Sequence, residues 1–149
     1  MSAPQPSLKG LALRLLSGRE HSRAELERKL KFYEETPGTL SSALDELQAK
    51  GFISEQRVLE SVLNRRAAKL GATRIVQELQ GKGLDPDAIS AALASLKATE
   101  TERALAVWQK KFGTPAANAP EAARQMRFLA SRGFGADAIR RVLKDRASD

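Results

Sequence analysis

Apolar residues recur along the chain three or four positions apart. The first group, Leu8, Leu11, Ala12, Leu15 and Leu16, follows the i, i+3, i+4, i+7 pattern of an amphipathic helix. Similar groups continue to the end of the chain, and no long stretch alternates apolar and polar positions as a strand would. The pattern therefore predicts an all-helical protein.

Start and stop signals divide the pattern into nine helices. Ser22-x-x-Glu25 and Thr99-x-x-Glu102 have the spacing of capping boxes. Asp85-Pro86 places a capping residue before a proline at the first helical position, where the missing N–H costs nothing. Gly51 ends the third helix as a left-handed residue. These signals predict three groups of three helices, with breaks near residues 53 and 98.

The last group contains the large apolar side chains that could bind bases or fill a core. Trp108 and Phe112 fall at helical spacing on the seventh helix, and Met126 lies on an eighth helix that runs from Pro120-Glu121 to Gly133. Aromatic rings can stack on bases in single-strand binders. The spacing favours core packing for Trp108 and Phe112, and Met126 is also predicted to lie in the core.

Part of the chain repeats with a period of fifty residues. Asp87-Ala88-Ile89-x-x-x-Leu93 returns as Asp137-Ala138-Ile139-x-x-x-Leu143. Lys82-Gly83-Leu84 and Arg132-Gly133-Phe134 precede the two copies at the same shift, and Lys50-Gly51-Phe52 is an earlier, similar signal. A fixed period of this size is typical of stacked supersecondary units. Function is therefore expected on an extended repeat surface rather than in one pocket.

Composition limits the kind of partner. The 149 residues are 42% apolar but only 5% aromatic, which suits several small cores. The net charge of +7 and the isoelectric point near 10.1 favour a polyanion or an acidic protein surface, although a basic protein without a nucleic-acid role stays possible. Residues 103–149 hold ten Lys/Arg against four Asp/Glu. No cysteine, apolar membrane-length run or secretory signal is present, so a cytoplasmic protein with no membrane contact is expected.

Catalytic and metal-binding groups are scarce. His21 is the only histidine, and its place before a helix cap favours a structural contact. Gly81-Lys82-Gly83 lacks the glycine spacing and the following Ser/Thr of a phosphate loop, which indicates a helix end. Paired carboxylates such as Glu25 and Glu27 lie among basic residues and favour ion pairing. We expect no catalytic residues, metal or cofactor, and hence no enzyme.

Basic residues form the candidate binding surface, in two groups. On a fourth helix that runs from Ser54 to near Gly71, Arg65 and Lys69 are predicted to share a face at i, i+4 spacing. Arginine suits phosphates and carboxylates because its planar fork donates two parallel hydrogen bonds. The alternative is that these basic residues only form solvent-exposed helix faces that keep the protein soluble. The candidates of the middle group are Arg57, Arg65, Arg66, Lys69, Arg74 and Lys82, and those of the last group are Arg124, Arg127, Arg132, Arg140, Arg141 and Lys144.

A series of motifs stands in one order over roughly residues 8–145. The motifs are His21-Ser22-x-x-Glu25-Leu26-x-x-Lys29-Leu30, Leu44-x-x-Leu47-x-x-x-Gly51-Phe52-Ile53, Arg57, Arg65, Gly71-x-x-Arg74-Ile75-x-x-Glu78-Leu79-x-x-Lys82-Gly83-Leu84, Lys111-Phe112-Gly113 and Arg127-Phe128-Leu129-x-x-Arg132-Gly133-Phe134. With these motifs, the chain resembles the RecX family of bacterial recombinase regulators. Val58 and Ala72 depart from the family's pattern, which puts only local packing in doubt.

The resemblance implies three tandem three-helix repeats that form an elongated, curved rod. The expected repeats are residues 8–53, 54–98 and 99–149, after a flexible lead of residues 1–7. The resemblance also implies a monomer that binds the RecA–DNA filament and inhibits its ATPase and strand exchange, with roles in DNA repair, recombination and the SOS response. Binding to single- or double-stranded DNA is expected to be weaker and to lie chiefly at phosphates, without sequence preference.

Two other functions stay open from the sequence. Short helices joined by glycine turns, with arginines on one face, also suit a helix-turn-helix-like DNA-binding regulator. An all-helical adaptor without any nucleic-acid link is the third possibility.

Overall fold

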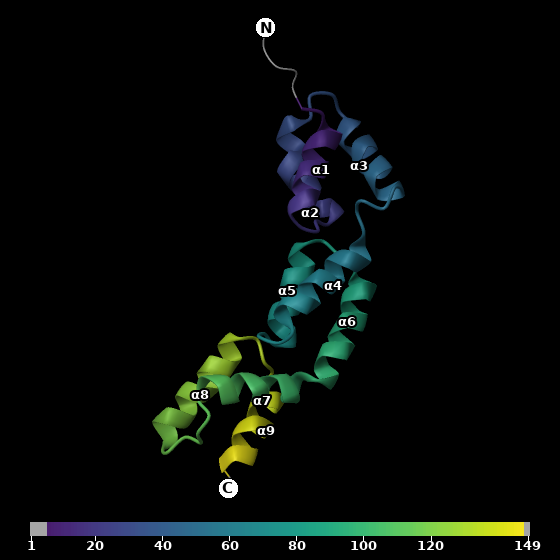
Figure 1. Ribbon diagram of the computed structural model, residues 1–149. Helices are drawn as coiled ribbons and strands as arrows, with labels where there is room; N and C mark the ends of the chain where they lie inside the picture. Colours follow the sequence, from purple (N-terminus) through teal and green to yellow (C-terminus); the bar gives the residue numbers. More distant parts are fainter. Residues whose placement is uncertain (1–5, 148–149) are drawn as a thin grey trace. The chain divides into compact units, whose positions relative to one another are not determined.

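The computed structural model describes the backbone of residues 6–147 and the side chains of residues 6–144. This part of the chain folds into nine α-helices and one 3₁₀ helix, without a strand, so the predicted all-helical class is confirmed (Figure 1). Of the predicted lead, residues 1–5 lie outside the described residues, while Ser7 caps the first helix. The helices are α1 Leu8–Gly18, α2 Arg23–Leu30, η1 Lys31–Tyr33, α3 Thr39–Ala49, α4 Glu55–Arg66, α5 Ala72–Gly81, α6 Pro86–Ala98, α7 Glu100–Lys111, α8 Ala119–Ser131 and α9 Ala136–Ala147.

The chain divides into two compact units. The first unit is Met1–Ser61 with Lys82–Leu84, and the second is Val62–Gly81 with Asp85–Asp149. The division passes through α4 and assigns the turn after α5 to the first unit. The sequence-predicted repeat limits at residues 53 and 98, and the curved rod, stay predictions.

The core of the first unit is a bundle of α1, α2 and α3, each of which contacts the other two. Leu26 on α2 and both Leu44 and Leu47 on α3 are fully buried, together with Ala12 on α1. These positions lie on the apolar faces that helical spacing predicts. Fully burying one leucine side chain stabilises a fold by about 1.5–3 kcal/mol. The leucines thus hold this unit together.

The core of the second unit centres on Trp108 of α7, which is 2% exposed, so its predicted core position is confirmed. Its indole Nε1 donates a hydrogen bond to Gln125 Oε1 on α8, 2.9 Å away. Leu129 and Val142 close the core from α8 and α9. A buried indole N–H needs an acceptor, which explains the buried glutamine.

Met126, predicted to lie in the core, is instead 46% exposed. Its neighbour Gln125 takes the inward position because it accepts the Trp108 hydrogen bond. The helix also begins earlier than Pro120. The side chain of Asn118 accepts a hydrogen bond from the Glu121 N–H at 2.9 Å, so Asn118 is the N-cap and Ala119 the first helical residue. The sequence signal Asn-x-x-Glu marks this start.

Two other predictions about helix ends have different outcomes. The Ser22 capping box is confirmed, since the Ser22 hydroxyl accepts from the Glu25 N–H and Glu25 accepts from the Ser22 N–H, both at 3.1 Å. The Thr99 capping box is wrong, because α6 ends at Ala98 and α7 begins at Glu100. Thr99, between them, lacks the extended backbone that a capping residue needs.

The fourth helix is shorter than predicted. It ends at Arg66, so Lys69 lies in the following turn, and the predicted i, i+4 pair of Arg65 and Lys69 on one helix is wrong. The guanidinium of Arg103 on α7 donates hydrogen bonds from Nη1 to the carbonyl oxygens of Ala67 at 2.9 Å and Leu70 at 2.6 Å. These bonds satisfy carbonyls beyond the helix end, and so they stabilise the turn.

The fifty-residue sequence period corresponds to a repeated contact. In the first unit, Gly83 has a left-handed φ of +70°, and a Cβ on it would lie 2.8 Å from the Cβ of Ala24. In the second unit, Gly133 has φ of +90°, and a Cβ on it would lie 2.7 Å from the Cβ of Arg74. Both members of the second pair stand fifty positions after those of the first. We call these two pairs the glycine contacts.

A hydrogen bond accompanies each glycine contact. The Ser22 hydroxyl donates to the Lys82 carbonyl at 2.6 Å, and the Gly71 N–H donates to the Arg132 carbonyl at 2.8 Å. Each acceptor directly precedes the left-handed glycine, at a helix end whose carbonyls lack intrahelical partners. The same architecture therefore recurs in the two units, although its donors differ.

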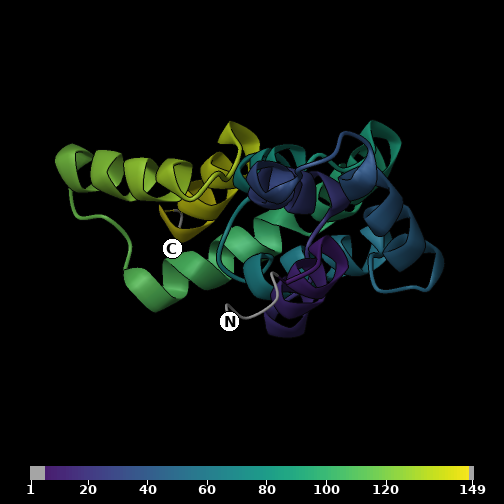
Figure 2. The same ribbon diagram turned by 90° about the horizontal axis from the view of Figure 1, so that it is seen from above.

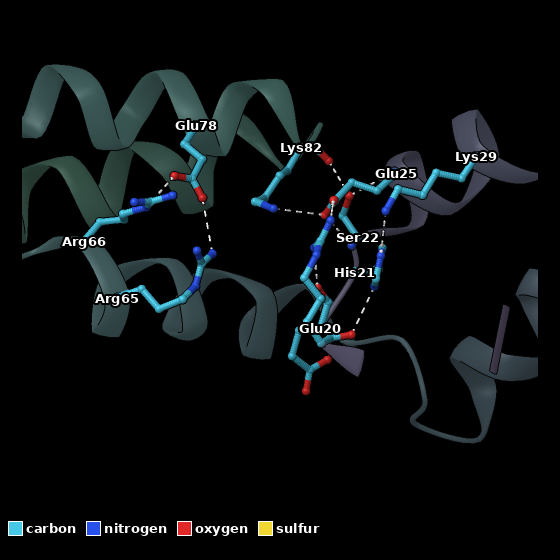
Figure 3. Close-up of polar contacts among 10 residues, drawn as sticks. Glu20, His21, Ser22, Glu25, Lys29, Arg65, Arg66, Glu78 and Lys82 are labelled. Carbon is cyan, nitrogen blue, oxygen red and sulfur yellow. Dashed lines mark hydrogen bonds and ion pairs between the residues drawn. The ribbon is translucent and has the colours of Figure 1, made fainter. Parts of the chain in front are cut away.

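A buried ion pair reinforces the contact in the first unit (Figure 3). The Glu25 side chain, 8% exposed, accepts from Arg19 Nη2 at 2.7 Å and pairs with Lys82 Nζ at 3.3 Å. Burial alone would raise the pKa of Glu25, but the hydrogen bonds from Arg19 and Ser22 and the Lys82 charge outweigh it and lower that pKa to about 2.

His21 is buried beside this pair. Lysine can only donate, so Lys29 Nζ donates to His21 Nε2, at 3.0 Å. The ring proton is therefore on Nδ1, which donates to the Arg19 carbonyl at 3.0 Å. Burial is the main cause that lowers the pKa of His21. The predicted structural role of His21 is confirmed.

Replacing Gly133 with alanine should destabilise the protein more than replacing Gly51. Both glycines have left-handed φ, so each alanine costs about 1 kcal/mol of backbone strain. A Cβ at 133 would also lie 2.8 Å from the Arg74 nitrogen, whereas one at 51 meets nothing within 4 Å. In urea unfolding followed by circular dichroism, Gly133→Ala should lose roughly 2 kcal/mol more. Equal losses would contradict the close contact.

Acid should weaken the protein in two steps. Because folding lowers the pKa of His21 below its ordinary 6.5, the unfolded chain binds more protons as the pH falls through 6.5, and the free energy of unfolding drops. Glu25 adds a second loss as the pH falls from 4.5 to about 2. Melting temperatures between about pH 7.5 and 5 should fall for the wild type and change less for His21→Asn. Identical slopes would contradict the role of His21, the only histidine.

Candidate functional site

The twelve predicted basic residues differ in how the fold already uses them. Lys82 is 13% exposed at its side chain and is paired with Glu25. Arg57 donates from Nε to Glu20 Oε1 at 2.8 Å and from Nη2 to the Gly51 carbonyl at 2.7 Å. These contacts all lie within the first unit. Both residues therefore serve the packing of that unit, and Lys82 offers little surface to a partner.

Arg65 and Arg66 share one carboxylate, that of Glu78 on α5 (Figure 3). The distances are 3.3 Å from Arg65 Nη2 and 3.1 Å from Arg66 Nε, and both guanidiniums stay well exposed. Lys69, in the turn that follows, is exposed and has no side-chain partner among the described residues. The end of α4 thus presents three cations with one neutralising carboxylate.

Arg74 connects α5 to the end of α8. Its Nη1 donates to the Ser131 carbonyl at 2.7 Å, and its Cβ lies against Gly133. The residue is exposed as a whole, yet its guanidinium is held in place. We interpret Arg74 as chiefly a structural link within the second unit.

The predicted residues of α8 and α9 are exposed but differ in how far other side chains engage them. Arg124, Arg127 and Arg141 are exposed, and their side chains have no partner among the residues that the structure describes. Arg140 forms an exposed ion pair with Asp137, one turn earlier on α9. Lys144, also on α9, is exposed. Exposed ion pairs contribute only about 0–1 kcal/mol, so a partner's anion can compete for Arg140.

Arg132 belongs to a small aromatic cluster that the sequence analysis missed. The rings of Phe112 and Phe128 meet edge to face, with centroids 5.5 Å apart. Arg132 lies 4.9 Å and Lys111 5.3 Å from the centre of the Phe128 ring. The i, i+4 spacing of Phe128, on α8, and Arg132, the C-cap residue of that helix, was a usable signal. Such cation–π contacts hold two positive charges close to an aromatic face.

A groove between α8 and α9 gathers three of the predicted residues. These helices contact each other, and they are coloured yellow-green and yellow in Figures 1 and 2. The groove has a volume of about 660 Å³. Its lining includes the apolar side chains of Met126, Ile139 and Leu143 and the basic side chains of Arg127, Arg140 and Lys144. Arg124, Arg132 and Arg141 are not part of this lining.

The groove could not be predicted from the sequence, because helical spacing placed Met126 in the core. In the structure, Gln125 points inward in place of Met126, the next residue on α8. Met126 therefore lines the groove on the surface. That arrangement follows from the hydrogen bond between Trp108 and Gln125, which links two helices. Helical periodicity along one helix carries no information about it.

Among the side chains of residues 6–144, no three from His, Asp or Glu gather as a metal ion requires. No helix in the described part of the chain is long and apolar enough to cross a membrane.

Three family models match in tandem. Residues 9–47 match the first three-helix domain of RecX, residues 54–93 the second, and residues 98–143 the third. These matches account for most of the chain. They agree with the resemblance that the motifs indicated, and the tandem arrangement of three-helix units is confirmed.

Curated relatives match over nearly the whole length. The regulatory protein RecX of Leptothrix cholodnii is 53% identical over 141 residues, which cover 95% of this chain and 90% of the relative. That of Herminiimonas arsenicoxydans is 46% identical over 144 residues, or 97% and 95%. The crystal structure of RecX from Lactobacillus salivarius has the same fold, with a TM-score of 0.77 at 19% identity over 95% of this chain and 96% of that one. The chain belongs to the RecX family of regulatory proteins.

Proposed function

We propose that the chain binds the RecA–DNA filament and restrains its ATPase, strand exchange and recombination activity, without chemistry of its own. The observation that carries this proposal is the family membership across all three three-helix domains. The relatives are named regulatory proteins, and RecA is the target that the resemblance implies. In a cell, this activity would act in DNA repair and the SOS response, in the cytoplasm.

The charge of the chain supports an anionic partner. The net charge is +7, and the exposed cations of α8 and α9 add to those at the end of α4. A DNA–protein filament offers phosphates and repeated protein surfaces to such cations. Contacts to phosphate are largely sequence-independent, so weaker binding to free single- or double-stranded DNA is part of the proposal.

Tandem domains suit a target that itself repeats. We propose three repeats, residues 8–53, 54–98 and 99–149, in an elongated monomer that contacts several RecA protomers. Linked weak contacts add through a high effective concentration, so tight binding does not need one deep pocket. A chain bound across protomers would hold them in a geometry unsuited to ATP turnover or block a second DNA.

The fold suggests which predicted residues carry binding. Lys82, Arg57 and Arg74 are engaged by backbone carbonyls or buried carboxylates. The proposed binding set is therefore the remainder of the predicted residues, whose side chains reach the surface, namely Arg65, Arg66, Lys69, Arg124, Arg127, Arg132, Arg140, Arg141 and Lys144.

A helix-turn-helix-like DNA-binding regulator is the competing function. Arg140 and Arg141 favour it, because both are exposed on α9, the third helix of a three-helix domain, and the third helix reads the major groove in three-helix variants of that module. Such a regulator would discriminate a specific duplex from random DNA at the same salt concentration. A filament regulator would show no such discrimination.

The purified chain should lower the DNA-dependent ATPase rate of RecA from the same organism at substoichiometric amounts. The reason is that each bound chain is proposed to span several protomers. A steady-state ATPase assay over a range of ratios at low salt measures it. A rate that does not change at any ratio would contradict the filament proposal.

Neutralising the end of α4 should weaken filament binding. Arg65→Gln, Arg66→Gln and Lys69→Gln together remove three exposed charges, and an affinity loss of about tenfold is expected if each contributes near 0.5 kcal/mol. Glu78→Gln is the matched control, because it loosens the same side chains but frees both guanidiniums for a partner. Co-sedimentation should show weaker binding for the triple variant and equal or tighter binding for Glu78→Gln. If both variants lose affinity alike, the effect is structural and the cations are not contacts.

A further inference from the structure

The groove between α8 and α9 combines an apolar lining with basic side chains from both helices. Its apolar lining includes Ile139, which is buried, and Met126, which is 46% exposed. A volume of about 660 Å³ lies within the usual range of ligand clefts. A large methionine surface left open in a hollow is typical of protein-binding grooves, because the flexible thioether adapts to different partners.

We propose that this groove binds an acidic amphipathic helix of a partner protein. The helix would place apolar side chains on Met126, Ile139 and Leu143. Its flanking carboxylates would face Arg127, Arg140 and Lys144. Laying an amphipathic helix into an apolar groove is a common mode of peptide recognition, in which anchors repeat at i, i+3 or i+4, and i+7.

The positions of the cations argue for an acidic occupant. Arg140 and Lys144 stand four residues apart on α9, and Arg127 stands on α8. Both helices that border the groove therefore carry positive charge, and none of the described residues that line it is acidic. Asp137 pairs with Arg140 at an exposed site, so a carboxylate of the partner can replace it at small cost. Complementary charge on both sides also fixes the orientation of a bound helix.

The apolar lining argues against nucleic acid as the occupant. Phosphates gain nothing from apolar surface, and bases bind by stacking on aromatic rings. None of the described residues that line this groove is aromatic, and the Phe112–Phe128 pair is not part of the lining. The exposed Arg124 and Arg141, outside the groove, suit phosphates better.

The inference goes beyond the proposed function, because it concerns a protein segment whether or not that segment belongs to RecA. Failure of RecA inhibition would leave it intact. Conversely, an empty groove would leave filament binding through other cations intact. The two proposals therefore fail in separate assays.

The test uses the full chain and synthetic helical peptides of about sixteen residues. The first probe has leucines at i, i+4 and i+7 with glutamates beside them. The second replaces these glutamates with lysines, and the third replaces the leucines with serines. Fluorescence anisotropy should show binding of the first probe alone, with a Kd of roughly 10–100 μM at moderate salt.

Trp108 reports whether the probe occupies this groove. It is the only tryptophan, and its Nε1 donates to Gln125, which lines the groove. Displacing Gln125 changes the surroundings of the indole, so its emission should shift upon saturation with the first probe. Peptide binding without any change in Trp108 emission would place the probe elsewhere and overturn the proposal.

Arg127→Glu and Arg124→Glu form a matched pair on one helix. Both residues are exposed and have no side-chain partner among the described residues, but only Arg127 lines the groove. Arg127→Glu should weaken the affinity for the first probe by about tenfold, and Arg124→Glu should weaken it by less than about twofold. Equal losses would overturn the proposal, as would equal binding of the glutamate and lysine probes. Displacement of the first probe by a single-stranded oligonucleotide, in an Arg127-dependent way, would assign the groove to phosphates instead.

Discussion

A left-handed glycine pressed against the start of another helix is the constraint that organises this protein. Gly83 lies against Ala24 and Gly133 against Arg74, and in each case the carbonyl just before the glycine accepts a hydrogen bond. Only glycine suits both the backbone conformation and the close approach. Because the two contacts stand fifty positions apart, the sequence period is the period of a packing contact.

Sequence reasoning was reliable where a signal is local. Periodicity predicted the helices, and the Ser22 box and the left-handed glycines mark ends that the structure has. Sequence reasoning failed where a residue far along the chain determines a helix end or the burial of a side chain. Lys69 lies outside α4 because Arg103, on α7, donates hydrogen bonds to the carbonyls of the turn. Met126 is exposed because Gln125 takes the inward position and accepts the hydrogen bond of Trp108. Neither partner can be found by spacing alone.

The same limit applies to the candidate surface. Spacing grouped the basic residues, but their availability depends on carboxylates and carbonyls far along the chain. Lys82 is paired with Glu25, fifty-seven positions away, and Arg74 donates to Ser131, also fifty-seven away. Arg127, Arg140 and Lys144 meet at one groove because α8 packs beside α9. The fold thus separates cations that hold helices together from cations that face outward.

We propose that the outward-facing cations of this RecX family member engage the RecA–DNA filament. Hydrogen–deuterium exchange of the chain, with and without the filament, tests it most directly, because it reports each helix separately. We expect slower exchange in α8, in α9 and at the end of α4 when the filament is present. Unchanged exchange throughout, or protection confined to α1–α3, would contradict it.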